Sequence, residues 1–205
     1  LLTSTSEVYG VAEDDIWTED TKSLIGPTTK LRWSYAASKM IDEFIALSLY
    51  EEKKVSPIIV RLFNIIGPNQ LSKFGMVVPR FIEAAINDED ILIHGDGSQS
   101  RSFTWVDDVV TYLIKLAELK AYGEIFNIGQ TEEITIKELA ELIIEKSNSN
   151  SKIIYKSHEE VFGKSFEDPN RRTPGIEKIV EFTGIKPSKN IEFMVENIIN
   201  YKQNN

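Results

Sequence analysis

Hydrophobic residues in this chain follow two spacings, one helical and one typical of strands. From Ser34 to about Glu52 they recur at the spacing of an amphipathic helix, and Ser34 is a suitable N-cap for it. Residues 57–63 form a short apolar run with β-branched side chains, as in strands buried on both faces of a parallel sheet. The first residues, 1–6, predict the end of another buried strand that runs into a polar loop.

The rest of the chain continues this alternation of strands and helices. Helices are predicted at 78–87, 106–119, 136–146, 176–183 and 191–201, and strands at 91–93, 125–129 and 153–155. Thr135, followed three residues later by Glu138, matches a capping box at the start of one helix. We therefore predict an α/β fold with a mostly parallel, doubly wound sheet and a smaller α/β part.

Composition narrows the chemistry that this chain can perform. Of its 205 residues, 41% are hydrophobic and 27% charged, which is typical of a globular protein with a proper core. The chain has no cysteine and two histidines, so thiolate catalysis is excluded and no metal site is predicted. A net charge of −9 argues against nucleic-acid binding. Because we find neither a long uncharged apolar run nor a signal peptide, we expect a cytoplasmic protein without membrane contact.

Small anions can still bind locally, because several arginines lie among turn or strand signals. Their guanidinium groups are candidates to meet on a phosphate. These residues are Arg61, Arg80, Arg101, Arg171 and Arg172.

Tyr35 and Lys39 are four residues apart in the first predicted helix, so a phenol and an ammonium share one helical face. An ordinary tyrosine, with a pKa of about 10, is a poor base at neutral pH. A cation one turn away favours the phenolate. The pair is a candidate proton-transfer device, although the same spacing also fits an exposed helix face with a solvated lysine.

Five motifs occur in order along the chain and point to one family. They are Thr5-Ser-Glu-Val-Tyr-Gly10, Tyr35-x-x-x-Lys39, Arg61-Leu-Phe-Asn64-x-x-Gly-Pro68, Gly95-Asp-Gly-x-Gln-x-Arg101 and Asp107-Asp108. With them the chain resembles, over nearly its whole length, an extended short-chain dehydrogenase/reductase of the NAD-dependent nucleotide-sugar epimerase/dehydratase family. The resemblance implies NAD as cofactor and the C-terminal portion of a Rossmann-like sheet.

The chain departs from the family pattern at its N-terminal end. Family members begin with a strand and a Gly-rich turn that binds the dinucleotide pyrophosphate, and no G-x-x-G-x-x-G occurs here. We expect these 205 residues alone to bind NAD poorly. By resemblance, 1–68 and 102–129 are the remainder of the NAD-binding domain, whereas 69–101 and 130–205 form an interleaved nucleotide-sugar-binding part.

The resemblance assigns a catalytic role to each residue of the proton-transfer site. Tyr35 is the base that takes a proton from the sugar 4-hydroxyl, while Lys39 supports the phenolate and holds the nicotinamide ribose. Thr5 hydrogen-bonds the same sugar oxygen; the simpler interpretation is that Thr5 caps a strand end. Ser4 and Phe63 are expected beside the cofactor.

A second group of residues is expected, by resemblance, around the nucleotide sugar. Asn64 and Arg101 match groups that contact the diphosphate, and Arg172 matches an arginine at the sugar end. His94 occupies the position where relatives stack an aromatic ring on uracil. The predicted substrate-binding residues are Ser6, Asn64, Val77, His94, Arg101 and Arg172. Tyr9, Asp107 and Asp108 are expected to be structural, the two aspartates at a helix N-terminus.

Glu7 bears on which reaction follows oxidation at C4. Dehydratases of the family carry Asp-Glu after the catalytic Thr, whereas this chain has Ser6-Glu7, as in UDP-glucuronate decarboxylases. Those enzymes use the Glu and an arginine matching Arg172, and bacterial members share Arg32-Trp33. In contrast, motifs at 26–30 and 75–79 resemble those of nucleotide-sugar 4-epimerases.

Three functions therefore remain open at the level of sequence. We expect a UDP-sugar 4-epimerase first and a UDP-glucuronate decarboxylase as the alternative. A third hypothesis is an inactive piece that retains only nucleotide-sugar binding or dimerisation. The resemblance also implies a homodimer of the complete protein, formed through a helix bundle to which the Tyr35 helix contributes.

Overall fold

The chain alternates strands and helices in the order that its apolar pattern predicts. The structure is a computed structural model that describes residues 1–72, 76–157 and 171–204. Its elements in chain order are β1 (Leu2–Thr5), the 3₁₀ helix η1 (Ser6–Tyr9), α1 (Trp33–Glu51), β2 (Ile59–Leu62), β3 (Ile65–Ile66), α2 (Val77–Ile86), β4 (Ile91–His94), β5 (Ser100–Ser102), β6 (Thr104–Trp105), α3 (Val106–Glu118), β7 (Ile125–Ile128), β8 (Glu133–Thr135), α4 (Ile136–Ser147), β9 (Ile153–Lys156), α6 (Glu177–Thr183) and α7 (Ile191–Asn204).

The predicted buried strands pair in parallel, which confirms the fold class. Strands β1, β2 and β7 form one sheet with β2 in the middle. Their register pairs Thr5 with Leu62, and Leu62 with Ile128, so the carboxyl ends of the strands lie at one edge. In parallel α/β sheets this edge is where ligands bind.

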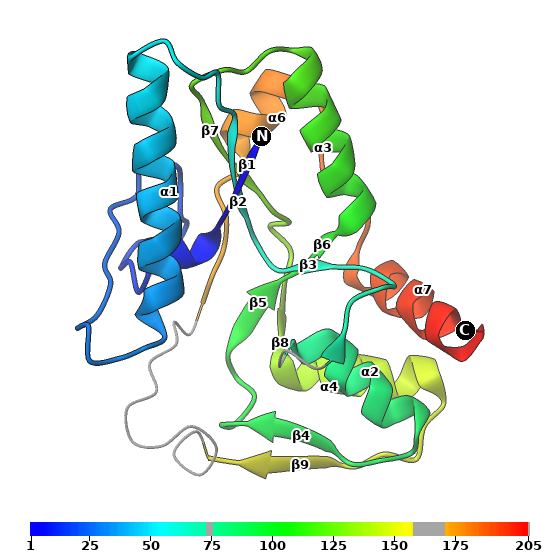
Figure 1. The fold of residues 1–205 in the computed structure, drawn as a ribbon. Coiled ribbons are helices and arrows are strands. Elements are labelled where there is room, and N and C mark those ends of the chain that lie inside the picture. The colour runs from blue at the N-terminus through cyan, green and yellow to red at the C-terminus, as the bar shows by residue number, and fades with distance from the viewer. Residues whose placement is uncertain (73–75, 158–170, 205) are drawn as a thin grey trace.

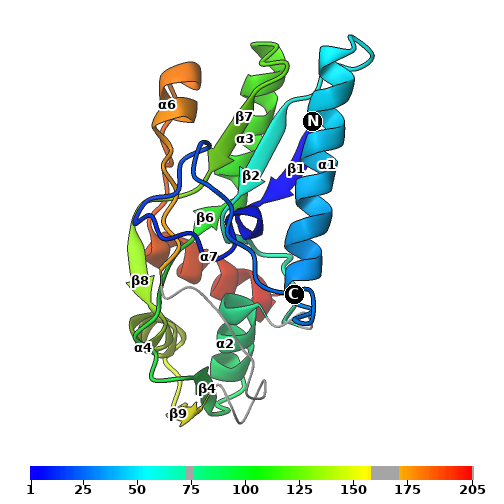
Figure 2. The ribbon, with the colours of Figure 1, turned by 90° about the vertical axis from the view of Figure 1, so that its left-hand side faces the viewer.

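Helices cover both faces of this sheet. Figure 1 shows α1 on one side of the strands and α3 on the other, and Figure 2 shows α1 beside β1 and α6 beyond β7. Apolar side chains of β2 and β7 pack with those of α3, and Ile179 of α6 joins the same cluster. The domain boundary predicted at residue 130 stays a prediction, and α6 packs on the sheet although it follows that boundary.

A smaller part of the fold lies below the carboxyl ends of the strands (Figure 1). It contains a parallel pair, β4 with β9, and an antiparallel pair, β5 with β8. Helices α2, α4 and α7 pack around a second apolar cluster. The predicted capping box is present, because Thr135 accepts from the Glu138 amide while the Glu138 side chain accepts from Thr135.

The start of α1 differs from the prediction. The helix begins at Trp33 and its N-cap residue is Arg32, which makes no side-chain capping bond. Ser34 does not cap the helix, because its hydroxyl donates to the Leu31 carbonyl, 2.7 Å away, and lies within the first turn. The helix therefore begins without a side-chain cap.

Three sequence expectations concern a motif residue, membrane-spanning helices and metal-binding side chains. Gly75, in one of the epimerase-like motifs, lies outside the described residues. Across residues 1–72, 76–157 and 171–204, no helix combines the length and apolar character that crossing a membrane requires. In the same ranges, no three His, Cys, Asp or Glu side chains gather as metal ligands would.

Two glycines with similar φ values allow a test of how tightly the turn after η1 is packed. Gly10 has φ 68° and ψ −119°, and a Cβ placed on it would lie 2.0 Å from the Leu24 carbonyl oxygen. Gly184, at the end of α6, has φ 71°, and a Cβ there would meet no atom within 4 Å.

We predict that Gly184→Ala costs about 1 kcal/mol, the usual cost of a left-handed alanine. Gly10→Ala should cost about 3 kcal/mol or more, because backbone strain and a steric clash add. Urea denaturation followed by circular dichroism measures both changes. Equal losses at the two positions would show that Leu24 does not constrain the turn.

Candidate functional site

Thr5 lies where β1 ends at the ligand-binding edge of the sheet. Its side-chain oxygen accepts a hydrogen bond from the Glu7 backbone amide over 3.2 Å, which caps η1. A hydroxyl also has one proton to donate. Thr5 thus caps the 3₁₀ helix that follows the strand and keeps a hydroxyl proton to donate, and its role at a sugar oxygen stays a prediction.

Tyr35 and Lys39 lie on α1, which packs against β1 and η1. The Tyr35 side chain is 52% exposed, so its phenol is accessible. The Lys39 ammonium lies 3.3 Å from an Asp42 carboxylate oxygen at the surface. The structure therefore places the helix with both residues beside the strand and turn that carry Thr5.

Glu7 lies between two arginines that approach its carboxylate from different segments. Arg172 donates to one oxygen through Nη1, and Arg32 donates to the other through Nη2 over 3.4 Å. Arg32 stacks over the Trp33 ring, 4.6 Å from its centroid. The Glu7 carboxylate and two guanidinium groups therefore gather beside Thr5.

Backbone pairing explains how Arg172 reaches Glu7 across 165 positions of sequence. The segment after Arg172 runs parallel to the chain at Trp17, where the Trp17 amide donates to the Thr173 carbonyl over 2.9 Å. The Gly175 amide donates to the Trp17 carbonyl over 2.8 Å. The sequence predicted that Glu7 and Arg172 act together, and the structure joins them.

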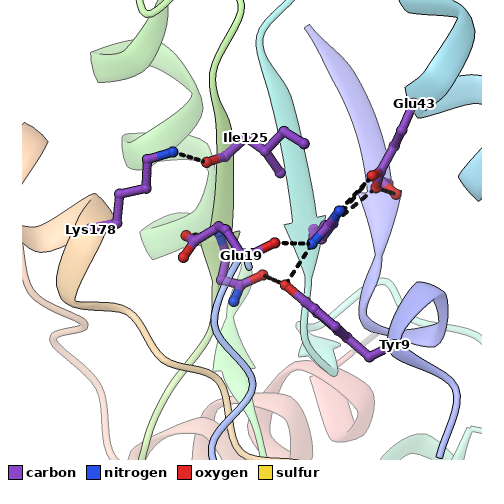
Figure 3. Close-up of polar contacts among 8 residues, drawn as sticks. Tyr9, Glu19, Glu43, Ile125 and Lys178 are labelled. Carbon is purple, nitrogen blue, oxygen red and sulfur yellow. Dashed lines mark hydrogen bonds and ion pairs between the residues drawn. The ribbon is translucent and has the colours of Figure 1, made fainter. Parts of the chain in front are cut away.

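A buried polar network lies behind the turn, and its pairing was missed by the sequence analysis (Figure 3). Glu43 of α1 is 5% exposed and accepts from the Ser4 hydroxyl. Arg61 of β2 donates to the Glu43 carboxylate through Nη2 over 2.7 Å and to the Tyr9 hydroxyl over 2.9 Å. Tyr9 donates to the Asn127 side chain over 2.6 Å. The signal in the sequence was a glutamate four residues after Lys39, on the same helical face.

Two residues predicted beside the cofactor are buried in this structure, and their contact with the cofactor stays a prediction. Ser4 is 4% exposed, and its hydroxyl is bonded to Glu43. Phe63 is fully buried among Tyr9 and Trp17, with ring centroids 6.0 and 6.4 Å away. In this structure both support the site from behind.

Three of the five arginines that the sequence offers for an anion contact different groups in this structure, and anion binding stays a prediction. Arg61 is bound to Glu43, and Arg171 pairs with Glu133 at the surface, 2.6 Å apart. Arg80 donates to the Leu92 carbonyl over 3.2 Å. Each of these three therefore serves a separate contact.

Three of the six predicted substrate-binding residues, Val77, His94 and Arg101, lie on the smaller part of the fold, and all six roles remain predictions. The Asn64 amide donates to the Ser102 carbonyl over 2.9 Å, and Arg101 donates to the Ser100 carbonyl over 2.6 Å. His94 ends β4, with Nε2 3.4 Å from Arg80 Nη1. Val77 begins α2, and Ser6 is buried at the start of η1.

The residues expected to be structural are confirmed as such. Tyr9 is fully buried in the polar network. Asp107 accepts from the Trp105 indole over 3.0 Å at the start of α3. Asp108 accepts from both the amide and the hydroxyl of Ser188, at 2.9 and 2.8 Å.

Comparison with known proteins identifies the family. The family model described as "NAD dependent epimerase/dehydratase family" matches residues 1–129. The chain belongs to this family. The match confirms the family that the five sequence motifs predicted.

Curated relatives include decarboxylases, and solved structures include epimerases. The chain is 40% identical over 189 residues to a UDP-N-acetyl-alpha-D-glucosaminuronate decarboxylase of Bacillus cytotoxicus, covering 92% of this chain and 58% of that protein. It is 35% identical to UDP-glucuronic acid decarboxylase 4 of Arabidopsis thaliana, covering 91% of this chain and 40% of that protein. A UDP-N-acetylglucosamine 4-epimerase from Methanobrevibacter ruminantium superposes with a TM-score of 0.86 at 26% identity, over 99% of this chain and 62% of that one. The chain thus spans about half the length of these curated relatives.

Two buried tyrosines predict how stability depends on alkaline pH. Burial raises the pKa of Tyr9 from 10.0 to about 12, against the opposing effect of Arg61. Burial, together with the charge of Asp108, raises the pKa of Tyr112 to about 12. Folding therefore favours the protonated phenols, and this contribution is complete below pH 10 and lost as the pH rises through about 12.

We predict a loss of about 1.4 kcal/mol per pH unit for each tyrosine in that window. Urea denaturation at several pH values measures the slope, which Tyr9→Phe and Tyr112→Phe should each reduce. Tyr155→Phe, at the exposed tyrosine of β9, is the matched control. A slope that both buried-site variants leave unchanged would contradict the prediction.

Proposed function

We propose that the protein containing this chain is an NAD-dependent enzyme that decarboxylates a UDP-hexuronate through a 4-keto sugar. The main support is the position of the Glu7 carboxylate, which accepts hydrogen bonds from both Arg172 and Arg32. The sequence analysis placed 4-epimerisation first. The decarboxylases among the relatives and this arrangement together favour decarboxylation.

The accessible groups on α1 fit the nicotinamide end of NAD. The Tyr35 phenol is half exposed, and the Lys39 ammonium lies beside the surface carboxylate of Asp42. These two residues would hold the nicotinamide ribose, whereas the buried Ser4 and Phe63 would support the pocket from behind. When bound, NAD supplies the acceptor and donor of hydride for C4 of the sugar.

Proton transfer at the C4 oxygen is the task of Tyr35. In this step the Tyr35 side chain takes the hydroxyl proton, with the Lys39 cation one helical turn away on α1. Thr5 donates a hydrogen bond to the same oxygen, because its hydroxyl keeps its proton to donate while it accepts from the Glu7 amide. The oxygen is thereby held as a ketone forms at C4.

The charges around Glu7 suit the next step at C5 and C6. Arg172 and Arg32 are the guanidinium groups that the substrate carboxylate would contact, because both already lie at the Glu7 carboxylate beside Thr5. The Glu7 carboxylate close by disfavours a second anion and so favours departure as neutral carbon dioxide. The electron pair of the broken C5–C6 bond moves towards the C4 oxygen, and C5 then takes up a proton.

A 4-epimerase acting on a UDP-sugar is the second candidate. It is supported by the superposition on the archaeal 4-epimerase and by the motif at residues 26–30. This reaction needs room for the 4-keto sugar to turn over and no group at C5. Glu7 and Arg172 would then position the substrate only.

The proposal includes a homodimer and the division into two interleaved parts. On the outward face of α1, Ile41, Phe44 and Ile45 are 56%, 68% and 54% exposed. An exposed apolar patch of this kind on one helix is consistent with packing against a helix of a second copy, as the proposed homodimer requires.

An assay of the complete protein with UDP-glucuronate and its 2-acetamido analogue distinguishes the candidates. We expect carbon dioxide and a UDP-pentose. UDP-galacturonate without carbon dioxide would overturn the decarboxylase in favour of the epimerase. No product and no NAD reduction would support the inactive piece.

We further predict that Arg172→Gln lowers carbon dioxide release by about 10²-fold, because a charge aimed at the reacting group is lost. Reduction of NAD by the sugar, followed by absorbance, should persist in this variant. Arg171→Gln is the matched control, since Arg171 pairs with Glu133 at the surface. Equal effects of the two substitutions would remove the role given to Arg172.

A further inference from the structure

We infer that the buried ion pair between Glu43 and Arg61 is a positioning device. It fixes the turn that carries Thr5 and Glu7 relative to the helix that carries Tyr35. This inference rests on the proposed function, and neither Glu43 nor Arg61 is proposed to touch the substrate.

Glu43 lies on the same face of α1 as the proton-transfer residues. Tyr35, Lys39 and Glu43 are separated by four residues each, so they form one stripe of the helix. Tyr35 is half exposed at one end of the stripe, whereas Glu43 is buried at the other. The proton-transfer residues, Tyr35 and Lys39, and the buried Glu43 therefore lie on one face of α1.

The turn is held by this anchor on both of its sides. Ser4, directly before Thr5, donates its hydroxyl to Glu43. Tyr9, at the end of η1, accepts from Arg61 over 2.9 Å. Residues 5–7 therefore lie between two points that the same ion pair fixes.

The strands of the sheet hold the other end of the network (Figure 3). Arg61 belongs to β2, and Asn127, the acceptor for Tyr9, belongs to β7. Glu19 joins both, because its carbonyl accepts from Arg61 over 3.0 Å and its carboxylate accepts from the Asn127 amide over 2.7 Å. The anchor is thus part of the rigid sheet.

The bonds of Arg61 leave it no role at the diphosphate. Its Nε and Nη2 donate to Glu43, at 3.1 and 2.7 Å, and its Nη1 donates to Tyr9 and to the Glu19 carbonyl. The guanidinium also stacks over the Tyr9 ring, 4.8 Å from its centroid. Burial works to lower the pKa of Arg61, but the bonds with Glu43 and Tyr9 outweigh it and raise the value.

We expect the Glu43–Arg61 ion pair to affect the rate of the reaction more than the affinity for the UDP-sugar. Displacing a catalytic group by about 1 Å costs on the order of 10²-fold in rate. Loss of the Ser4 and Arg61 bonds frees the turn from α1, so the Thr5 hydroxyl loses its place beside the C4 oxygen. The contacts expected for the diphosphate lie elsewhere, so KM for the UDP-sugar should change little.

The test is a double-mutant cycle in the complete protein between Glu43→Gln and Thr5→Ala. The measured quantity is the single-turnover rate of NAD reduction by the UDP-hexuronate. We expect Glu43→Gln to lower this rate by about 10- to 100-fold when Thr5 is present and by less than about 2-fold when it is absent. A drop of the same size in both backgrounds would overturn the inference, because Glu43 would then act on stability alone.

Two further variants separate positioning from general damage. Glu51→Gln removes an exposed carboxylate near the end of the same helix and should leave the rate unchanged. Arg61→Lys keeps the charge but loses the two-pronged contact with Glu43, so it should show an intermediate rate. Arg61→Lys also provides the second variant for the cycle if Glu43→Gln does not fold.

Amide hydrogen exchange distinguishes failure of this inference from failure of the proposed function. If the unmodified protein reduces no NAD with these sugars, the proposed function fails, but exchange still reports on the anchor. Glu43→Gln should speed exchange of the Glu7 and Gly10 amides, which the turn protects, and Glu51→Gln should not. Unchanged exchange at the turn in Glu43→Gln would overturn the inference.

Discussion

The buried carboxylate of Glu43, a residue of α1, constrains the structure around it. Removing a charge from water costs several kcal/mol unless its partners compensate, so Glu43 is tolerated only while Arg61 and Ser4 stay in place. Breaking such a pair by removing one partner typically costs about 3 to 5 kcal/mol. Because the partners belong to β1 and β2, the requirement ties helix and sheet into one arrangement. The positions of Thr5 and Tyr35 follow from it.

The two arginine-glutamate groupings differ in where they lie. Glu43 and Arg61 pair with each other and are largely closed from solvent. Glu7, Arg32 and Arg172 lie beside Thr5, at the edge where parallel sheets bind ligands. In the proposed function the first grouping sets geometry, and the second attracts a sugar carboxylate.

Local features of this fold were predictable from the sequence, whereas its long-range pairings were not. The helices and buried strands follow from apolar spacing, and the Thr135 capping box from residues three positions apart. Ser34 was predicted wrongly, because its hydroxyl had a competing carbonyl within the same turn. Arg61 and Glu43 are 18 positions apart, and composition alone does not reveal which arginine a buried glutamate will meet. Glu7 and Arg172 were linked only through the resemblance.

In the proposed function, Thr5, Tyr35, Glu7 and Arg172 all contact the same sugar. A crystal structure of the complete protein with NAD and a UDP-hexuronate would show whether they do. We expect the sugar C4 oxygen within hydrogen-bond distance of Tyr35 and Thr5, with the C6 carboxylate beside Arg172 and Glu7. A sugar bound with its carboxylate turned away from Arg172, towards solvent, would overturn the proposed arrangement.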